Sequence, residues 1–331
     1  MSDKFDVVIT DFITDALEPE RGILNDIATV EALDARSEDD LVGRIEQVDA
    51  IILYHELTLT QRTLQRLEKC KLIVRGGVGI DNVDWPFARE RGIPVANVPD
   101  YGSEEVADSA IAFTLSLTRG THVLNSRMKV SPDPWSYLQV APLTRLRGQV
   151  FGVVGLGRIG TATALRAKAL GMEVVFYDPY KPDGYDKAQG IRRVETIEEL
   201  LAESLVVSLH CPLSEETNQM FDAKRIGQMR RGSYLVNTAR GAVVDTTALP
   251  DAVASGQLAG AAIDVLEQEP PAADHPLLVA WRDANHPACH RVIINPHSAF
   301  YSEQGLLDMR VKSAEACRRA VLGKPLRNVV N

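Results

Sequence analysis

The sequence predicts an α/β protein with two doubly wound parallel sheets. Its 331 residues exceed what one ordinary hydrophobic core organises. Short runs rich in β-branched residues alternate with helical patterns from the N-terminus onward, and this alternation is typical of parallel sheets. A glycine-rich run follows one such strand only at residues 151–160, so a separate α/β domain must precede it. We therefore expect two Rossmann-like domains separated by a cleft.

The first predicted domain comprises residues 1–102 and 299–331 and is expected to be flavodoxin-like. Its strands are predicted at Phe5–Thr10, Asp49–Leu53, Lys71–Arg75 and Pro94–Asn97. A helix from Ser103 to Arg119, with Ser103 as its N-cap and two glutamates in its first turn, is predicted to connect this domain to the next.

The second predicted domain spans residues 103–298 and contains the glycine-rich run. Further strands are predicted at Glu173–Tyr177, Leu205–Leu209, Gly232–Asn237, Leu258–Ile263 and Arg291–Asn295, with helices at Thr161–Leu170, Thr196–Ala202 and Thr247–Ser255. Segment Gly120–Leu146 is predicted to be a loop that carries aromatic residues. Two interpretations of that loop stay open, contact with a second subunit or an internal surface loop.

The glycine-rich run has the pattern G-x-G-x-x-G directly behind an apolar strand. The first glycine permits a tight turn, the second lets a pyrophosphate approach the backbone, and the third allows close helix packing. The N–H groups of the following helix would face the phosphates. The expected dinucleotide site therefore includes Gly155, Leu156, Gly157, Arg158, Ile159 and Gly160.

Asp178 follows the next predicted strand, at the spacing where a carboxylate accepts hydrogen bonds from the adenosine ribose. A carboxylate there repels a 2′-phosphate, and no arginine directly follows it. The expected cofactor is therefore NAD rather than NADP.

Composition narrows the class of protein. A net charge of −9 argues against nucleic acid or an anionic membrane as the main partner. No apolar run reaches the ~18 residues of a membrane span, and Met1–Asp6 has acids where a signal peptide has bases. The scattered cysteines predict reduced thiols and a cytoplasmic location. His286, Cys289 and His290 match no familiar zinc spacing, so no metal is expected.

Chemistry-bearing side chains follow three later strands, at the edge where ligands of such sheets bind. They are Arg240, then Asp264 and Glu269, then His297. An imidazole can hold a proton near neutral pH, and a neighbouring carboxylate favours its charged form. A planar guanidinium can engage carboxylate and carbonyl oxygens together. This set suits reduction of the carbonyl group of an anionic substrate.

At these residues the chain resembles the D-isomer-specific 2-hydroxyacid dehydrogenases, and the likeness extends over essentially the whole sequence. It is most similar to the branch that includes the C-terminal binding proteins, through Leu53–Leu59 (LYHELTL), Arg75–Asn82 (RGGVGIDN) and Pro296–Gln304 (PHSAFYSEQ). The resemblance implies NAD-dependent interconversion of a D-2-hydroxy acid and its 2-oxo acid by a homodimer. The first domain would be the substrate domain and the second the NAD-binding domain.

The resemblance also implies individual roles. His297 would donate a proton to the carbonyl oxygen, Glu269 would be its partner, and Arg240 would clamp the substrate. Glu267 is the alternative partner, but the resemblance aligns the acid that immediately precedes Pro270.

Further site residues are implied in both domains. Val78 and Gly79 would hold the substrate carboxylate, Arg75 would contact the substrate, and His55 would lie in the pocket wall. An ion pair with a nearby acid is an equally open interpretation of Arg75, and Cys211 can be a small core residue. The implied cofactor contacts are Cys211, Pro212, Thr217, Thr238, Ala239, Asp264 and Phe300.

Some features depart from the family pattern. The segment around residues 280–290 looks longer than is usual in relatives, and it could tune substrate entry or extend a surface helix. Phe300 stands where the corepressor proteins have a tryptophan. An NAD-sensing, corepressor-like module with little turnover is the alternative function. Phosphoglycerate, glyoxylate and hydroxypyruvate stay open as substrates, whereas Glu269 disfavours formate dehydrogenase, which has a glutamine there.

Overall fold

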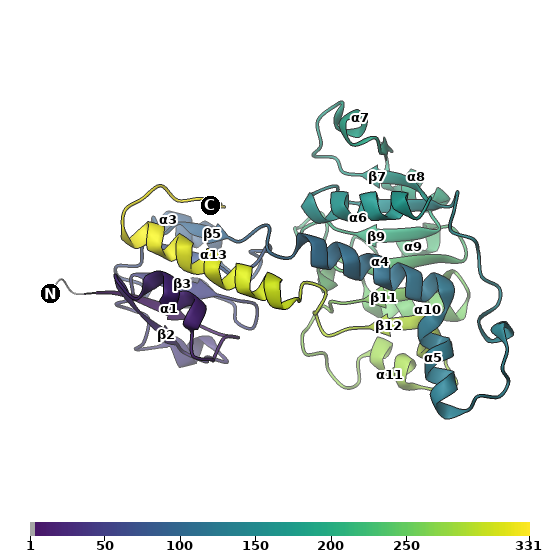
Figure 1. Cartoon of the computed structure of the whole chain (residues 1–331), viewed down its shortest axis with the longest axis horizontal. Helices are drawn as coiled ribbons and strands as arrows, with labels where there is room; N and C mark the ends of the chain where they lie inside the picture. Colours follow the sequence, from purple (N-terminus) through teal and green to yellow (C-terminus); the bar gives the residue numbers. More distant parts are fainter. Residues whose placement is uncertain (1–3) are drawn as a thin grey trace. The chain divides into compact units, whose positions relative to one another are not determined.

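The computed structural model describes residues 4–331, which divide into two compact units (Figure 1). Unit 1 runs to Gly102 and resumes at Ser302–Asn331, and unit 2 is Ser103–Tyr301. The sequence analysis placed the return to the first domain at residue 299, three residues earlier. Met1–Asp3, part of the acidic N-terminus that argues against a signal peptide, lie outside the described residues.

Unit 1 contains a five-stranded parallel sheet in the order β2-β1-β3-β4-β5, which is the flavodoxin order. The strands are β1 (Phe5–Ile9), β2 (Ala28–Ala32), β3 (Ala50–Leu53), β4 (Leu72–Arg75) and β5 (Val95–Asn97). The helices are α1 (Glu18–Leu24), η1 (Glu38–Leu41), α2 (Gln61–Leu64), α3 (Trp85–Glu90) and α13 (Glu303–Val321). The sequence analysis missed the edge strand β2, whose residues alternate between buried and exposed along Ala28–Glu31.

Successive strand residues of unit 1 enter two different cores, because side chains alternate across a strand. Val7 and Ile9 pack in the core that α1 and α13 cover, and Val8 packs in the opposite core. Figure 1 shows α1 and α13 side by side. The guanidinium of Arg310 on α13 joins them through two 2.7 Å hydrogen bonds to the fully buried Glu20 of α1.

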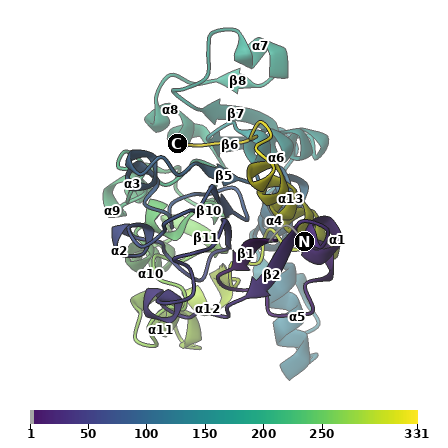
Figure 2. The same ribbon diagram turned by 90° about the vertical axis from the view of Figure 1, so that its left-hand side faces the viewer.

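Unit 2 contains a seven-stranded parallel sheet in the order β12-β11-β10-β9-β6-β7-β8, the Rossmann order with one added strand. Figure 2 shows β8, β7 and β6 in this sequence. The strands are β6 (Val150–Val154), β7 (Glu173–Tyr177), β8 (Arg192–Arg193), β9 (Val206–Leu209), β10 (Ser233–Asn237), β11 (Leu258–Ile263) and β12 (Val292–Ile294). The predicted fold class of two doubly wound parallel sheets is therefore confirmed.

The helices of unit 2 cover both faces of this sheet, with α4 packed along α6 (Figure 1). They are α4 (Ser103–Arg119), α5 (Thr121–Val130), η2 (Tyr137–Val140), α6 (Arg158–Ala169), α7 (Tyr185–Gln189), α8 (Ile197–Glu203), α9 (Ala223–Gln228), η3 (Gly241–Val243), η4 (Thr246–Ala248), α10 (Leu249–Ala254), α11 (Pro276–Arg282) and α12 (Ala288–Arg291). Among the described residues, no helix combines the length and apolarity needed to cross a membrane.

Two local predictions in unit 2 were wrong. Ser103 is the first helical residue of α4 rather than its N-cap, and its buried hydroxyl has no hydrogen-bond partner in the described chain. Only the residue before the helix has the extended backbone from which a side chain reaches the first-turn N–H groups. The segment Gly120–Leu146 is not a loop throughout, because its first part forms α5.

The sheet of unit 1 yields a prediction at Asp49, whose carboxylate is 6% exposed. Burial alone would raise the pKa of Asp49, but the N–H of Asp6 and the ammonium groups of Lys69 and Lys71 lower it below the ordinary value. A lowered pKa stabilises the fold above the ordinary aspartate value of about 3.9, and the gain is lost as the pH falls through the folded-state value. We expect Asp49→Asn to lower the free energy of unfolding by about 1 kcal/mol at pH 7.

This loss should become smaller when urea unfolding is repeated near pH 3, below the ordinary aspartate pKa. The control Asp34→Asn, which removes a half-exposed carboxylate, should change stability by less than about 0.5 kcal/mol at either pH. A deficit of Asp49→Asn that does not depend on pH would contradict this assignment.

Candidate active site

The glycine loop of unit 2 lies at the carboxyl end of β6, and each glycine is there for a different steric reason. Gly155 has a φ of 89°, and a Cβ there would lie 2.8 Å from the backbone nitrogen of Cys211. A Cβ at Gly160 would lie 2.1 Å from the carbonyl oxygen of Gly155. A Cβ at Gly157 would meet nothing within 4 Å, so the space beside this residue is open for a ligand. The loop therefore packs tightly on two sides and is accessible on the third.

Helix α6 begins directly behind this open position. Gly157 is its N-cap and supplies no side-chain hydrogen bond to the first turn. The first-turn N–H groups of a helix have no partner inside the helix, and they carry the positive end of its dipole. The start of α6 thus offers donors to a phosphate group.

Asp178 follows β7 and lies beside the glycine loop. Its Oδ2 accepts a 2.9 Å hydrogen bond from the N–H of Leu156, and its Oδ1 accepts a 3.0 Å bond from the N–H of Tyr180. The Nζ of Lys181 is 3.9 Å from Oδ2. A carboxylate held against the loop in this way can also accept hydrogen bonds from ribose hydroxyl groups, since each oxygen has a second lone pair.

The segment after β9 faces the glycine loop from the neighbouring strand. Burial raises the pKa of Cys211 to about 11, so the thiol stays neutral and packs as a small side chain. Thr217 donates a 2.6 Å hydrogen bond to the carbonyl of Pro212 and accepts a 2.8 Å bond from the N–H of Ser214. These bonds fold the segment into a compact turn.

The loop after β10 contains Thr238, Ala239 and Arg240. The fully buried Asn237 bonds both sides of this loop, because its side chain accepts from the N–H of Ala239 and donates to the carbonyl of Arg240. The buried hydroxyl of Thr238 has no hydrogen-bond partner in the described part of the chain. Such an orphan hydroxyl fits a polar ligand at this position.

Asp264, at the end of β11, organises the loop that contains His297. Its carboxylate is 2% exposed and accepts 3.0 Å hydrogen bonds from the N–H groups of Ser298 and Ala299. Its carbonyl accepts a 2.7 Å bond from the N–H of His297. Burial raises the pKa of Asp264, although the two N–H groups oppose the shift. His297 itself has a φ of 50°, in the left-handed region that side chains other than glycine rarely adopt.

His297 and Glu269 form an ion pair or hydrogen bond, with Nδ1 and Oε2 separated by 2.6 Å. The other oxygen of Glu269 accepts from the N–H of Leu266. Glu267 points elsewhere, because one of its oxygens accepts from both the N–H and the hydroxyl of Thr246. The ring of Phe300 lies edge-on to His297, with centroids 6.2 Å apart.

Gly241 brings the loop with Arg240 against the loop with Glu269. A Cβ at Gly241 would lie 1.9 Å from the carbonyl carbon of Leu266, so only glycine permits this approach of two backbones. Arg240 is half-buried and donates a 2.8 Å hydrogen bond to the carbonyl of Ala239. Three loops that start from β10, β11 and β12 thus meet at the carboxyl edge of the sheet.

Unit 1 has its own loop after β4. Arg75 is 7% exposed, and its Nε contacts the side-chain oxygen of Asn82 at 3.4 Å. Its Nη1 occupies the place of a Cβ at Gly77. Val78 is 37% exposed, and its carbonyl accepts a hydrogen bond from Asn97. Gly79 follows in the same turn and is half-buried.

His55 lies in the loop after β3 of unit 1, with its ring 4.6 Å from that of Phe12. The buried carboxylate of Asp11 shapes this loop by accepting hydrogen bonds from the N–H groups of Tyr54 and Glu56. Asn82 donates to the carbonyls of Tyr54 and Leu57.

Sequence reasoning missed the residues that position these loops, namely Asp11, Asn82, Asn237 and Thr246. The only available signal was their type, since Asp, Asn and Thr side chains often bond backbone groups. That signal is too common to single them out.

Known proteins match both the sequence and the fold. The family model described as "D-isomer specific 2-hydroxyacid dehydrogenase, NAD binding domain" matches residues 111–299. C-terminal-binding protein 1 of Caenorhabditis elegans is 34% identical over 313 residues, which are 92% of this chain and 42% of that protein. D-3-phosphoglycerate dehydrogenase of Methanocaldococcus jannaschii is 32% identical over 320 residues, covering 96% of this chain and 59% of that protein. The chain thus spans about half the length of these relatives.

Among solved structures, D-lactate dehydrogenase from Aquifex aeolicus, in complex with NAD and lactic acid, has a TM-score of 0.83 and 30% identity, with 96% of each chain covered. The glycine loop, the carboxylate of Asp178 and the orphan hydroxyl of Thr238 fit the dinucleotide that this family binds. The cofactor is NAD, and the chain belongs to the D-isomer-specific 2-hydroxyacid dehydrogenases.

Proposed function

We propose that this chain is an NAD-dependent oxidoreductase that interconverts a D-2-hydroxy acid and its 2-oxo acid, with His297 as the acid and base. The proposal rests on the 2.6 Å contact between Nδ1 of His297 and Oε2 of Glu269. The loop that contains Glu269 packs against the loop that contains Arg240. Proton transfer, carboxylate recognition and a hydride carrier are the three needs of this reaction.

Bound NADH supplies the hydride for reduction of a 2-oxo acid. Because Nδ1 of His297 faces Glu269, Nε2 is the ring atom that would give a proton to the substrate oxygen and take it back in the reverse reaction. The carboxylate of Glu269 would hold the ring in this orientation through its contact with Nδ1. The positive charge of Arg240 would stabilise the oxygen as negative charge develops on it.

We extend the proposal to the other implied contacts. In unit 1, the N–H groups of Val78 and Gly79 would bind the substrate carboxylate, with Arg75 and His55 as further substrate contacts. In unit 2, both oxygens of Asp264 already accept backbone N–H bonds, and the remaining lone pairs would accept the nicotinamide amide. The remaining proposed cofactor contacts are Arg158, Ile159, Cys211, Pro212, Thr217, Ala239 and Phe300.

The similarity to C-terminal-binding protein 1 supports a second candidate, an NAD-sensing binding module. The His297–Glu269 pair favours turnover over that alternative, because a module that only binds NAD needs no acid and base. A cytoplasmic homodimer is proposed as well. The homodimer rests on the exposed apolar side chains of one segment, with Trp135 85% and Tyr137 77% exposed, which a second copy would cover. The cytoplasmic location rests on the scattered cysteines.

The function is tested with NADH and a panel of 2-oxo acids that includes pyruvate, glyoxylate, hydroxypyruvate and 3-phosphohydroxypyruvate. We expect saturable NADH oxidation with at least one of them and a D-hydroxy acid as product. His297→Ala should lower kcat by about 10²–10⁴-fold, because it removes the proton donor. Its affinity for NADH, measured by fluorescence, should stay near that of the unsubstituted chain.

A matched pair of variants separates the two glutamates. Glu269→Gln should lower kcat, whereas Glu267→Gln should retain most of it, because an amide oxygen still accepts from Thr246. Unchanged turnover in His297→Ala would refute the role of His297, and no turnover with any oxo acid would favour the binding module.

Cofactor choice is predicted to depend on Asp178. Removal of its negative charge in Asp178→Ala should raise the ratio of kcat/KM for NADPH to that for NADH by about tenfold or more. The control Asp183→Ala removes a fully exposed charge from the same segment and should leave the ratio unchanged. A preference of the unsubstituted chain for NADPH would be incompatible with this role.

The backbone contact at Gly241 is predicted to position Arg240. In Gly241→Ala the added methyl group would separate the two loops, so we expect lower kcat and a loss of about 1–3 kcal/mol in stability. Gly227→Ala on α9, where a Cβ meets nothing within 4 Å, should be neutral or slightly stabilising. Kinetics and thermal unfolding measure both effects, and wild-type kcat in Gly241→Ala would disprove the positioning role.

A further inference from the structure

Lys181 is a charged residue beside the proposed ribose contact, and the proposed function leaves it without a role. It lies in the loop after β7, and its Nζ is 3.9 Å from Oδ2 of Asp178. The side chain of Asp178 is 12% exposed and that of Lys181 is 23% exposed. Charges that are mostly buried are screened less than surface charges, so each of them strongly influences a ligand at this position.

Lys181 is near the carboxylate of Asp178 without being one of its hydrogen-bond donors. Those donors are the N–H groups of Leu156 and Tyr180, at 2.9 Å and 3.0 Å. The 3.9 Å separation of Lys181 is longer than a normal N–H···O hydrogen bond of about 2.7–3.2 Å. No hydrogen bond within residues 4–331 uses the three donors of this ammonium group, so they can bind an anionic ligand.

Two contacts hold Lys181 at this place. Its carbonyl accepts a 3.1 Å hydrogen bond from Nη1 of Arg193 on β8, and its Nζ lies 5.0 Å from the centre of the Tyr185 ring on α7. Figure 2 shows β8 next to β7, at one end of the seven-stranded sheet, with α7 above it. The position of Lys181 therefore depends on neighbouring elements and not on Asp178 alone.

The other charged groups that contact this loop are already paired. Nη1 of Arg193 is 3.8 Å from the carboxylate of Asp183, and the carboxylate of Glu216 accepts a hydrogen bond from the hydroxyl of Tyr180. Lys181 is the only basic residue in the loop between β7 and α7. It is therefore the cation of this loop that an incoming anion would meet.

A 2′-phosphate is the anion that a dinucleotide can bring to this position. A phosphate monoester has a charge of about −1.5 to −2 at pH 7, and this one is attached to the ribose that Asp178 would bind. Asp178 repels this charge, whereas Lys181, close to the same carboxylate, attracts it. An ammonium group is a compact charge with three donors, which suits a phosphate. The two residues therefore act against each other on the choice between NADH and NADPH.

We propose that Lys181 is a specificity-determining residue of the dinucleotide site. Its ammonium group offsets the charge of Asp178 and binds the 2′-phosphate, so NADPH is a second and weaker ligand of the site that binds NADH. The inference rests on the proposed contact of Asp178 with the ribose, and it holds for whichever oxo acid the chain reduces.

The test is equilibrium binding of NADH and NADPH to the full chain, followed by the fluorescence of the reduced nicotinamide without an oxo acid, so the result does not depend on turnover. We expect the unsubstituted chain to bind both, with a lower Kd for NADH. Lys181→Gln should raise the Kd for NADPH about tenfold, because it removes a charged donor to the phosphate. The Kd for NADH should stay near that of the unsubstituted chain, because NADH has no phosphate at that position.

A double variant separates this role from that of Asp178. Asp178→Ala should strengthen NADPH binding relative to NADH, and Asp178→Ala/Lys181→Gln should lose most of that gain, because no cation then meets the phosphate. A gain that persists in full in the double variant would overturn the role of Lys181. No gain in Asp178→Ala would instead refute the ribose contact of Asp178, and the Kd values of the single Lys181→Gln variant would still decide the role of Lys181.

The matched control is Lys187→Gln, which makes the same charge change at an exposed position of α7. It should leave both Kd values unchanged. An equal loss of NADPH affinity in this control, or no binding of NADPH to the unsubstituted chain, would overturn the proposal. So would an equal loss of NADH and NADPH affinity in Lys181→Gln, because Lys181 would then only hold Asp178 in place.

Discussion

The buried carboxylate of Asp264 is the interaction on which the proposed catalytic centre depends. It receives two backbone N–H groups from the residues that follow His297, and the carbonyl of the same aspartate receives the N–H of His297. Hydrogen bonds to a charged group contribute about 1.5–3 kcal/mol each, enough to offset the left-handed backbone of His297, which costs about 1–3 kcal/mol. The strained loop then presents Nδ1 to Glu269.

Close approach of backbones is the second constraint on this edge of the sheet. Gly155 lets the cofactor loop touch the segment after β9, and Gly241 lets the loop of Arg240 touch that of Glu269. In both places a methyl group would overlap a backbone atom of the neighbouring loop. Glycine therefore sets the distances between the loops, and the side chains that follow supply the charges and protons.

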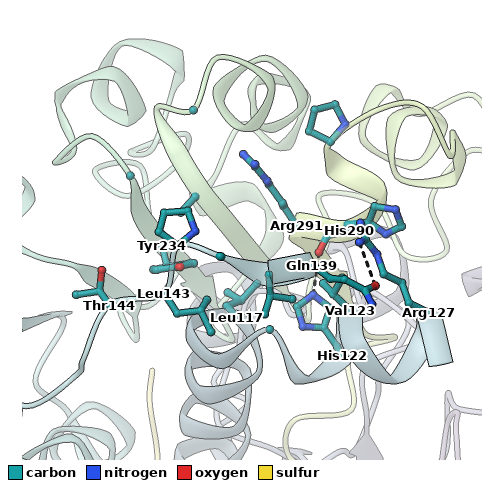
Figure 3. A pocket seen from close by; sticks show the side chains of 18 of the residues that line it. Leu117, His122, Val123, Arg127, Gln139, Leu143, Thr144, Tyr234, His290 and Arg291 are labelled. Carbon is teal, nitrogen blue, oxygen red and sulfur yellow. Dashed lines mark hydrogen bonds between the residues drawn. The ribbon is translucent and has the colours of Figure 1, made fainter. Parts of the chain in front are cut away.

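The two edges of the seven-stranded sheet differ in their charges. At the carboxyl edge, Asp178, Asp264 and Glu269 accompany the basic residues Arg240 and His297. At the amino edge, where β9, β10 and β11 begin, no described carboxylate lines the pocket of Figure 3, whose basic side chains include Arg127, His290 and Arg291. Parallel strands separate these two environments by their own length.

The sequence by itself determined the fold class, the glycine motif and most strands, because alternating apolar residues and turn residues are local signals that can be recognised without the structure. It also placed an arginine, acids and a histidine after successive strands. It missed β2 and α5, and it assigned the wrong position to Ser103, because those features depend on packing rather than on local pattern. Only the tertiary structure decided which glutamate contacts His297, because Glu267 instead accepts a hydrogen bond from Thr246, 21 positions earlier in the chain. The contacts of Asp264 with Ser298 and Ala299, which lie 34 and 35 positions later in the chain, likewise follow from the strand order. No local pattern encodes a contact between groups so distant in sequence.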